Sequence, residues 1–178
     1  MEKETAVFAG GCFWCTEAVF NTLKGIISAK PGYSGGDVAH PTYEEVSSGE
    51  TGHAEAILIE FNPEEISYKD LLTVFFASHD PTQANGQGAD IGEQYRSAIF
   101  YMNEEQEKEA RAYIDELKAE GIPVVTQLEA FTAFYDAEDY HKNYFENNKN
   151  AAYSRAVISP KLQKVQGRFQ NLLKQHRI

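Results

Sequence analysis

Short apolar runs alternate with amphipathic segments along the chain. Runs rich in β-branched and aromatic residues predict strands at Thr5–Phe8, His53–Phe61, Tyr95–Met102 and Val124–Phe131. Apolar residues at helical spacing, several preceded by capping residues, predict helices at Cys12–Leu23, Ser67–His79, Asn103–Glu120, Asp136–Asn148 and about 160–176. Strands and helices therefore follow one another through most of the sequence.

The order of these elements predicts an α+β fold. We expect a two-layer sandwich, in which a mixed β-sheet carries packed helices around a β-α-β-β-α-β-like core. The sequence has no low-complexity linker and no detectable repeat, so residues 1–178 are expected to form one domain. The helix at about 160–176 is expected to pack on the core through its apolar residues, which are Leu162, Val165, Phe169 and Leu172.

Two long segments are expected to be loops. Residues 30–51 contain several glycine, proline and serine residues, and residues 80–94 read DPTQANGQGADIGEQ. Loops of this length usually have a function beyond connecting two elements. Tyr43 lies in the first loop and Asp90 in the second, while Tyr95 follows at the start of the next strand. A phenol can be a core side chain or a hydrogen-bond donor at a site, and the pattern alone favours the core.

One acidic residue stands out on the predicted strand His53–Phe61. Alternation places Glu55 on the same face as Ile57, Ile59 and Phe61, which is the face expected to be buried. Burial disfavours the charged form of a carboxyl group, so we expect a raised pKa and a protonated acid near neutral pH. The alternative is a glutamate at a frayed strand end that reaches water.

Composition and charge narrow the function classes. The chain is 42% hydrophobic and has a net charge of −11, which disfavours nucleic acid and anionic lipid surfaces as partners. It contains no apolar run of membrane-spanning length and no basic start followed by an apolar core. We therefore expect a cytoplasmic protein.

Both cysteines lie in the stretch GGCFWC, at Cys12 and Cys15. The dipole at a helix N-terminus stabilises a thiolate, so we expect a lowered pKa for Cys12 and a nucleophilic role. Residues three apart on a helix lie near disulfide distance, so Cys15 is a candidate partner for an oxidised Cys12. Alternatives are two structural thiols, or half of a zinc site whose other ligands the scattered histidines do not supply. A CxxC motif before a helix also permits a thioredoxin-type thiol-disulfide oxidoreductase.

Six motifs together resemble one family. GGCFWCTE, PGYSGG, PTYEEV, GHAEAILIEF, FFASHDPTQANGQGADIGEQYRSAIF and FYDAEDYHKNY are similar, in this order, to the motifs of peptide methionine sulfoxide reductase A. The resemblance covers residues 8–144. It implies an enzyme that reduces the S epimer of methionine sulfoxide, free or in oxidised proteins. It also implies that no metal or organic cofactor is needed, only an external thiol reductant, and a monomer is expected.

The resemblance assigns roles to particular residues. Cys12 matches the nucleophile, which becomes a sulfenic acid, and Glu55 matches the general acid. Phe13 and Trp14 match the aromatic pair around the substrate's methyl group. Tyr43 and Tyr95 match the phenols around the sulfoxide oxygen. Asp90 matches a polar residue at the substrate site.

The sequence departs from the family's common form at three places. Cys15 stands where glycine is common, and the stretch KLQKVQGRFQNLLKQHRI lacks the recycling cysteines of many members. Gly86 stands where arginine is frequent, which puts a local charge contact in doubt. Regeneration of Cys12 is therefore left with two routes. Cys15 resolves the sulfenic acid as a disulfide that thioredoxin reduces, or thioredoxin, glutaredoxin or a small thiol attacks Cys12 directly.

Overall fold

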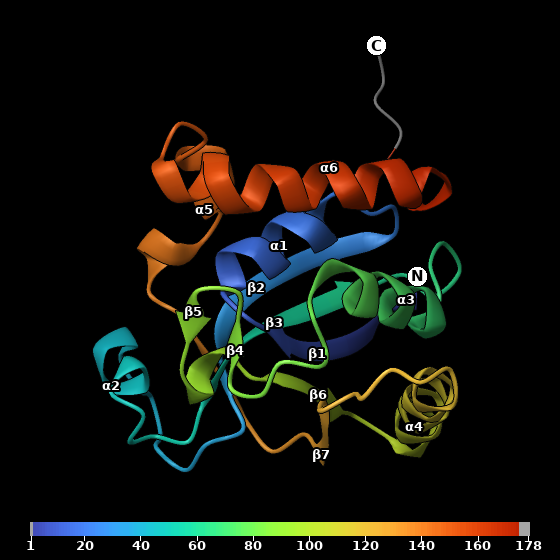
Figure 1. Cartoon of the computed structure of the whole chain (residues 1–178), viewed down its shortest axis with the longest axis horizontal. Coiled ribbons are helices and arrows are strands. Elements are labelled where there is room, and N and C mark those ends of the chain that lie inside the picture. Colours follow the sequence, from blue (N-terminus) through green and yellow to red (C-terminus); the bar gives the residue numbers. More distant parts are fainter. Residues whose placement is uncertain (1, 175–178) are drawn as a thin grey trace.

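A six-stranded mixed sheet forms the centre of the computed structural model, which describes residues 2–174 (Figure 1). Its strand order is β7-β6-β1-β3-β2-β8. The strands are β1 (Glu4–Gly10), β2 (Ile26–Ser34), β3 (Ala54–Phe61), β6 (Ser97–Tyr101), β7 (Gln127–Ala130) and β8 (Phe134–Asp136). The short strands β4 (Gly86–Gln87) and β5 (Asp90–Ile91) form a separate pair.

The core has the predicted β-α-β-β-α-β order. It consists of β1, α1 (Phe13–Asn21), β2, β3, α3 (Tyr68–Ser78) and β6. Neighbours within it pair antiparallel, whereas β6 and β7 pair in parallel, which makes the sheet mixed. The predicted α+β fold class is confirmed.

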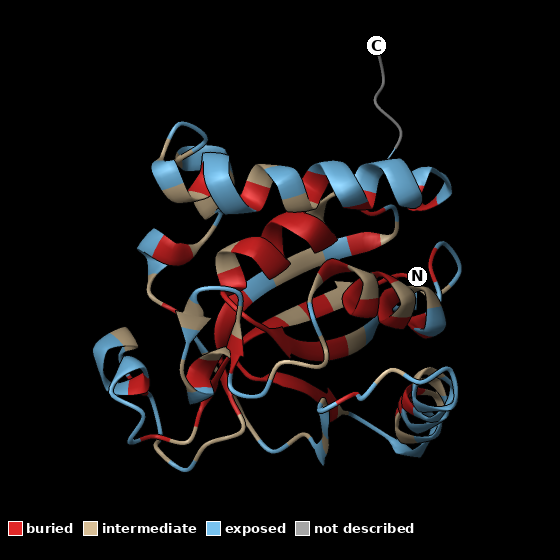
Figure 2. Ribbon diagram, in the orientation of Figure 1, coloured by how far each residue is buried: buried red, intermediate tan, exposed pale blue. Residues whose placement is uncertain are grey.

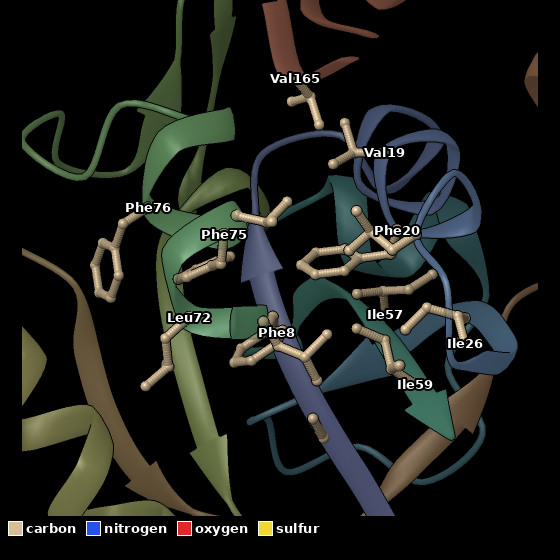
Figure 3. Close-up of a cluster of buried hydrophobic side chains, with 14 of the residues drawn as sticks. Phe8, Val19, Phe20, Ile26, Ile57, Ile59, Leu72, Phe75, Phe76 and Val165 are labelled. Atoms are coloured by element: carbon tan, nitrogen blue, oxygen red, sulfur yellow. The ribbon is translucent and has the colours of Figure 1, made fainter. Parts of the chain in front are cut away.

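Alternation along the strands separates two buried faces. Phe8 of β1 and Ile57 of β3 pack with α1 and α3, whereas Val7 and Ala56 belong to a second cluster on the other face. Figure 3 shows Phe8 between Phe20 of α1 and the α3 side chains. Burying a side chain of this size contributes about 1.5–3 kcal/mol relative to leaving it exposed. The helix-facing side is therefore the main core.

The remaining helices cover the edges and the outer surface. α6 (Ser159–Arg168) lies across α1 and α3, with Val165 facing Val19 (Figure 3), and α4 (Glu104–Ala119) packs on α3. In Figure 2, α1 is mostly buried while α6 exposes its outer side. Shorter elements are α2 (Tyr43–Ser47), α5 (Tyr144–Asn147), the π-helix Ser154–Ile158 and 3₁₀ turns at Glu93–Tyr95, Asp139–His141 and Gln170–Leu172. Within residues 2–174, none of the helices combines the length and apolar character that crossing a membrane requires.

The prediction of a loop over residues 30–51 is partly wrong. This region contains most of β2 and the helix α2, which begins after a capping box between Thr42 and Glu45. Gly32 interrupts the strand pattern in the sequence. Glycine is needed at this position because a Cβ there would lie 2.3 Å from the ring of Phe134. The close approach of β8 therefore requires a residue that usually weakens a strand.

The two C-terminal helix predictions also need correction. Asp136–Asn148 is not one helix, because Asp136 ends β8 and Asn143 has a φ of 54°, in the left-handed region. Only the four residues of α5 are helical there, after a 3₁₀ turn. The last helix begins with the π-helix, and α6 ends at Arg168. Positions 175 and 176 of the predicted helix lie outside the described residues.

Candidate active site

Cys12 lies at the junction between β1 and α1, at the N-terminal cap of the helix. Its carbonyl accepts hydrogen bonds from the N–H groups of Cys15 and Thr16. Gly11 makes the turn with a φ of 92°, and a Cβ there would lie 2.7 Å from the Gln87 side chain. Glycine is needed here for both reasons. The turn directs the thiol into the protein, where Cys12 is 9% exposed.

The expectation of a lowered Cys12 pKa is wrong. Burial raises the pKa of this thiol well above its ordinary value, and Glu55 and Cys15 raise it further. The Trp14 backbone N–H and the Tyr153 hydroxyl act in the opposite direction and lower the pKa of Cys12. The helix start does favour a thiolate, but desolvation and the nearby acid dominate. The resting nucleophile is therefore a neutral thiol.

Glu55 is buried beside the nucleophile, with 1% of its surface exposed. Its Oε1 accepts a hydrogen bond from the Phe13 backbone N–H over 3.2 Å. Burial raises the pKa of Glu55 to about 8, although the Phe13 N–H lowers it. The predicted burial and raised pKa are confirmed, and the exposed strand end is excluded. Among the described residues, Oε2 has no hydrogen-bond partner, so it is free to carry a proton.

Two half-buried phenols lie near this pair. Tyr43 is the first residue of α2, and Tyr95 ends the 3₁₀ turn that precedes β6. Burial raises the pKa of both phenols, and the charges of Glu55 and Cys12 also raise it. Both hydroxyls therefore stay protonated at neutral pH and can donate hydrogen bonds.

Trp14 is held by aromatic side chains from the C-terminal part of the chain. Its Nε1 donates a hydrogen bond to Nδ1 of His141 over 3.0 Å. Its ring stacks on Tyr144 with 3.7 Å between centroids, and Tyr153 packs edge-on at 5.6 Å. Phe13 is 1% exposed and its ring contacts that of His141 at 4.9 Å between centroids. The two aromatic residues after Cys12 are therefore fixed in orientation.

Cys15 is a free, buried thiol on the first turn of α1. Its Sγ lies 3.6 Å from the hydroxyl of Tyr153, which donates a hydrogen bond to Asp90 over 2.8 Å. Burial raises the pKa of Cys15, whereas Lys161 lowers it. Cys15, Tyr153 and Asp90 thus form a polar chain beside Cys12.

A cleft of about 710 Å³ leads to both thiols. Its lining includes Cys12, Cys15, Asp90 and Tyr153, together with apolar residues of α3, α4 and α6. The predicted site residues Glu55, Phe13, Trp14, Tyr43 and Tyr95 are not part of this lining. Cys12 therefore lines the cleft, whereas the acid and the aromatic residues lie outside its lining.

The structure places the other seven predicted site residues in the region of Cys12, and adds others that the sequence did not single out. His141 fixes Trp14, and Tyr153 reaches Cys15. Glu138 accepts hydrogen bonds from the Tyr33 hydroxyl and from the Tyr43 backbone N–H. The motif FYDAEDYHKNY was the available signal for two of them, since it contains Glu138 and His141. In residues 2–174, no three His, Cys, Asp or Glu side chains are grouped as a metal site requires.

Comparison with models of known protein families shows which family this chain belongs to. Residues 4–173 match the family model described as "Peptide methionine sulfoxide reductase". The chain belongs to the peptide methionine sulfoxide reductase family. The family member of Deinococcus radiodurans named MsrA is 54% identical over 92% of this chain and 81% of its own length. MsrA of Thermus thermophilus is 51% identical over 98% of this chain and 99% of its own.

Solved structures of this family have the same fold. The reduced form of Mxr1 from Saccharomyces cerevisiae has a TM-score of 0.79 and 34% identity, covering 84% of this chain and 88% of Mxr1. Methionine sulfoxide reductase A of Corynebacterium diphtheriae has a TM-score of 0.74 and 31% identity, covering 84% of this chain and 76% of that one. Mxr1 in complex with Trx2 has a TM-score of 0.58 and 26% identity, over 80% and 85% of the two chains.

Proposed function

We propose that this chain reduces methionine-(S)-sulfoxide, free or in oxidised proteins, to methionine at the expense of thiols. The observation that carries the proposal is the neutral carboxyl of Glu55 held beside the Cys12 thiol by the Phe13 backbone. Membership of the peptide methionine sulfoxide reductase family supports the same activity.

The chemistry needs a nucleophile and an acid together, because a sulfoxide sulfur is a weak electrophile until its oxygen is protonated. In the proposed reaction, the sulfur of Cys12 attacks the sulfoxide sulfur while Glu55 gives its proton to the oxygen. The S–O bond to methionine then breaks, the hydroxyl passes to Cys12, and methionine leaves. Cys12 is oxidised to a sulfenic acid as the sulfoxide is reduced.

Because the pKa of Cys12 is raised, its thiol is still protonated when the substrate binds, and this proton must be removed during the reaction. At neutral pH both the thiol and the Glu55 carboxyl carry protons in the resting enzyme. Glu55 gives its proton to the sulfoxide oxygen, so the thiol proton of Cys12 passes to the Glu55 carboxylate during attack and restores the neutral acid. Hydrogen bonds from Tyr43 and Tyr95 to the developing S–O hydroxyl favour this charge redistribution.

The aromatic residues suit the methyl group of the substrate. Phe13 and Trp14 offer two fixed rings, and an apolar wall binds a methyl group better than it binds the polar oxygen. We propose that the methyl group lies against these rings while the oxygen points to Glu55 and the phenols. We assign Asp90 to the rim of the substrate site, on the side of Cys15. This fixed placement of methyl and oxygen selects one sulfoxide epimer.

Electrons come from an external thiol rather than a bound organic cofactor. We propose thioredoxin as the physiological reductant, supported by the solved complex of the relative Mxr1 with Trx2. Glutaredoxin or a small thiol are the alternatives. We further propose that the chain acts as a monomer in the cytoplasm, where free thiols persist.

Turnover of separated methionine sulfoxide epimers with dithiothreitol tests the proposal. We expect loss of the S epimer only, and no turnover in Cys12→Ser. The proposal is wrong if neither epimer is consumed. Reduction of insulin disulfides without sulfoxide turnover would indicate a thioredoxin-type oxidoreductase, and stoichiometric zinc without turnover would indicate a zinc-binding module.

A further inference from the structure

Tyr153 connects the second thiol to an acidic residue. Its hydroxyl donates to Oδ2 of Asp90 over 2.8 Å and lies 3.6 Å from Sγ of Cys15. The distance to sulfur is within hydrogen-bonding range because sulfur is larger than oxygen. Since the hydroxyl proton is directed to Asp90, the hydroxyl oxygen accepts the proton of the Cys15 thiol. Tyr153 therefore orients this thiol in the resting enzyme.

The ring and the hydroxyl of Tyr153 have separate contacts. The ring packs edge-on against Trp14, and the residue directly precedes the π-helix Ser154–Ile158. Such π-helical turns are rare and often occur at functional sites. The hydroxyl alone reaches Cys15 and Asp90. A phenylalanine at this position would keep the packing and remove the polar chain.

We propose that Tyr153 is a positioning residue for Cys15 in the conversion of the Cys12 sulfenic acid to a Cys12–Cys15 disulfide. This inference rests on the proposed function, because that reaction supplies the sulfenic acid. It assigns to Cys15 the resolving role, in place of direct attack by an external thiol.

The proposed step is balanced within the site. The sulfur of Cys15 attacks the sulfur of Cys12, the S–S bond forms, and the S–O bond of the sulfenic acid breaks. The Cys12 sulfur is reduced from sulfenic acid to disulfide, and the Cys15 sulfur is oxidised from thiol to disulfide. The thiol proton leaves with the hydroxyl group as water. As Cys15 loses its proton, the Tyr153 hydroxyl turns from Asp90 to donate to the thiolate, which lowers the pKa of Cys15.

Tyr153→Phe tests the role of the hydroxyl in single turnover. With substoichiometric sulfoxide and no reductant, methionine release reports the first step, and loss of the second thiol reports disulfide formation. We expect disulfide formation to slow roughly tenfold more than methionine release, the effect of losing one hydrogen bond to the charged Cys15 thiolate. The pH profile of disulfide formation should also move to higher pH, which a packing role would not produce.

Tyr68→Phe is the matched control. It removes a buried hydroxyl that has no partner among the described residues, and its ring lies in the core beside Phe8. Both steps should keep their rates in this variant, and the thermal midpoints of the two variants establish that each is folded. Equal slowing of both steps in Tyr153→Phe, or no slowing of disulfide formation, would overturn the inference.

The single-turnover experiment on the wild-type chain distinguishes a failure of this inference from a failure of the proposed function. If it releases no methionine, the proposed function is wrong. If it releases one methionine and retains a sulfenic acid with Cys15 still free, the proposed function holds and the resolving role of Cys15 is wrong. Intact mass distinguishes the two products, because the sulfenic acid gains an oxygen and the disulfide loses two hydrogens.

Discussion

The backbone N–H of Phe13 donates a hydrogen bond to the Glu55 carboxyl over 3.2 Å. Phe13 follows Cys12 directly and is the first residue of α1, so the turn that places the nucleophile also places the acid. A backbone donor at a helix start holds one carboxyl oxygen and leaves the other free for a proton. The distance between acid and nucleophile is therefore set by the main chain.

Replacing Glu55 by glutamine should slow methionine release by about 10²–10⁴-fold, because the amide keeps the shape but cannot give up a proton as an acid does. Single-turnover assays with the S epimer measure this step directly. Glu138→Gln, at a carboxylate that holds Tyr33 and Tyr43, is the comparison. It should lose far less activity. An unchanged rate in Glu55→Gln would refute the role of the acid.

The same substitution should change the pH dependence of stability. The pKa of Glu55 is about 8 in the folded chain and near its ordinary value of 4.5 when unfolded, so the folded state favours the protonated form. Its contribution to stability is full below pH 4.5 and is lost as the pH rises through 8. Glu55→Gln should therefore gain stability over the wild type between these limits, on the order of 5 kcal/mol. Urea unfolding at pH 5, 6.5 and 8.5 checks this, and parallel curves would contradict it.

Cys12 should react slowly with an alkylating reagent in the resting enzyme. Burial, Glu55 and Cys15 all raise its pKa, and only the thiolate is a good nucleophile. In a Cys15→Ser background at pH 7.5, we expect iodoacetamide to modify Cys12 more than tenfold slower than in urea-unfolded chain. Adding Glu55→Gln should speed the reaction at pH 9, where the carboxylate is charged. A rate equal to that of the unfolded chain would show that the thiol is not suppressed.

Trp14 and His141 should be energetically coupled. The Trp14 Nε1–H donates to Nδ1 of His141, and Nε2 of this buried histidine has no partner among the described residues. Trp14→Phe therefore leaves both ring nitrogens unpaired, at a cost of about 1–3 kcal/mol. A double-mutant cycle with His141→Leu, followed by urea unfolding, should give a coupling of about 1 kcal/mol. Additive losses would mean that the hydrogen bond contributes nothing.

Lys161 should lower the pH at which the Cys15 thiol reacts. Burial raises the pKa of Cys15 and the ammonium group of Lys161 lowers it. Lys161→Gln should move the pH profile of disulfide formation upward, as measured by loss of the second thiol. Lys164→Gln is the control, because Lys164 lines the same cleft but is not among the main influences on the Cys15 pKa. The same displacement in both variants would indicate a general charge effect rather than a specific one.

The local pattern of apolar, polar and glycine residues in the sequence predicted the parts of the site that lie on regular helices and strands. The alternation along β3 placed Glu55 on the buried face, and the glycine turn placed Cys12 at a helix start. These features depend on neighbours within a few residues. The strand β2 escaped prediction because Pro31 and Gly32 break its pattern, and Gly32 is required by the approach of β8, more than a hundred residues away.

The electrostatics of the site depends on contacts that no local pattern contains. A helix start alone would lower the pKa of Cys12. The opposite result comes mainly from burial of the thiol, and then from Glu55, which bonds the Phe13 N–H across 42 residues. His141 and Tyr153 likewise reach α1 across 127 and 138 residues. Their roles become visible only when the two ends of the chain are placed together.

The distance in sequence between Cys12 and its C-terminal neighbours bears on how the enzyme is made. Because Cys12 precedes Tyr144 and Tyr153 by more than 130 residues, a growing chain releases the nucleophile long before these two residues emerge. Until then Cys12 lacks part of the burial that keeps it protonated, and its thiol behaves more like that of an unfolded peptide. Protection of the nucleophile is thus completed only after residues 144–153 have been made, so a chain cut short after α4 would carry a reactive cysteine without a complete site.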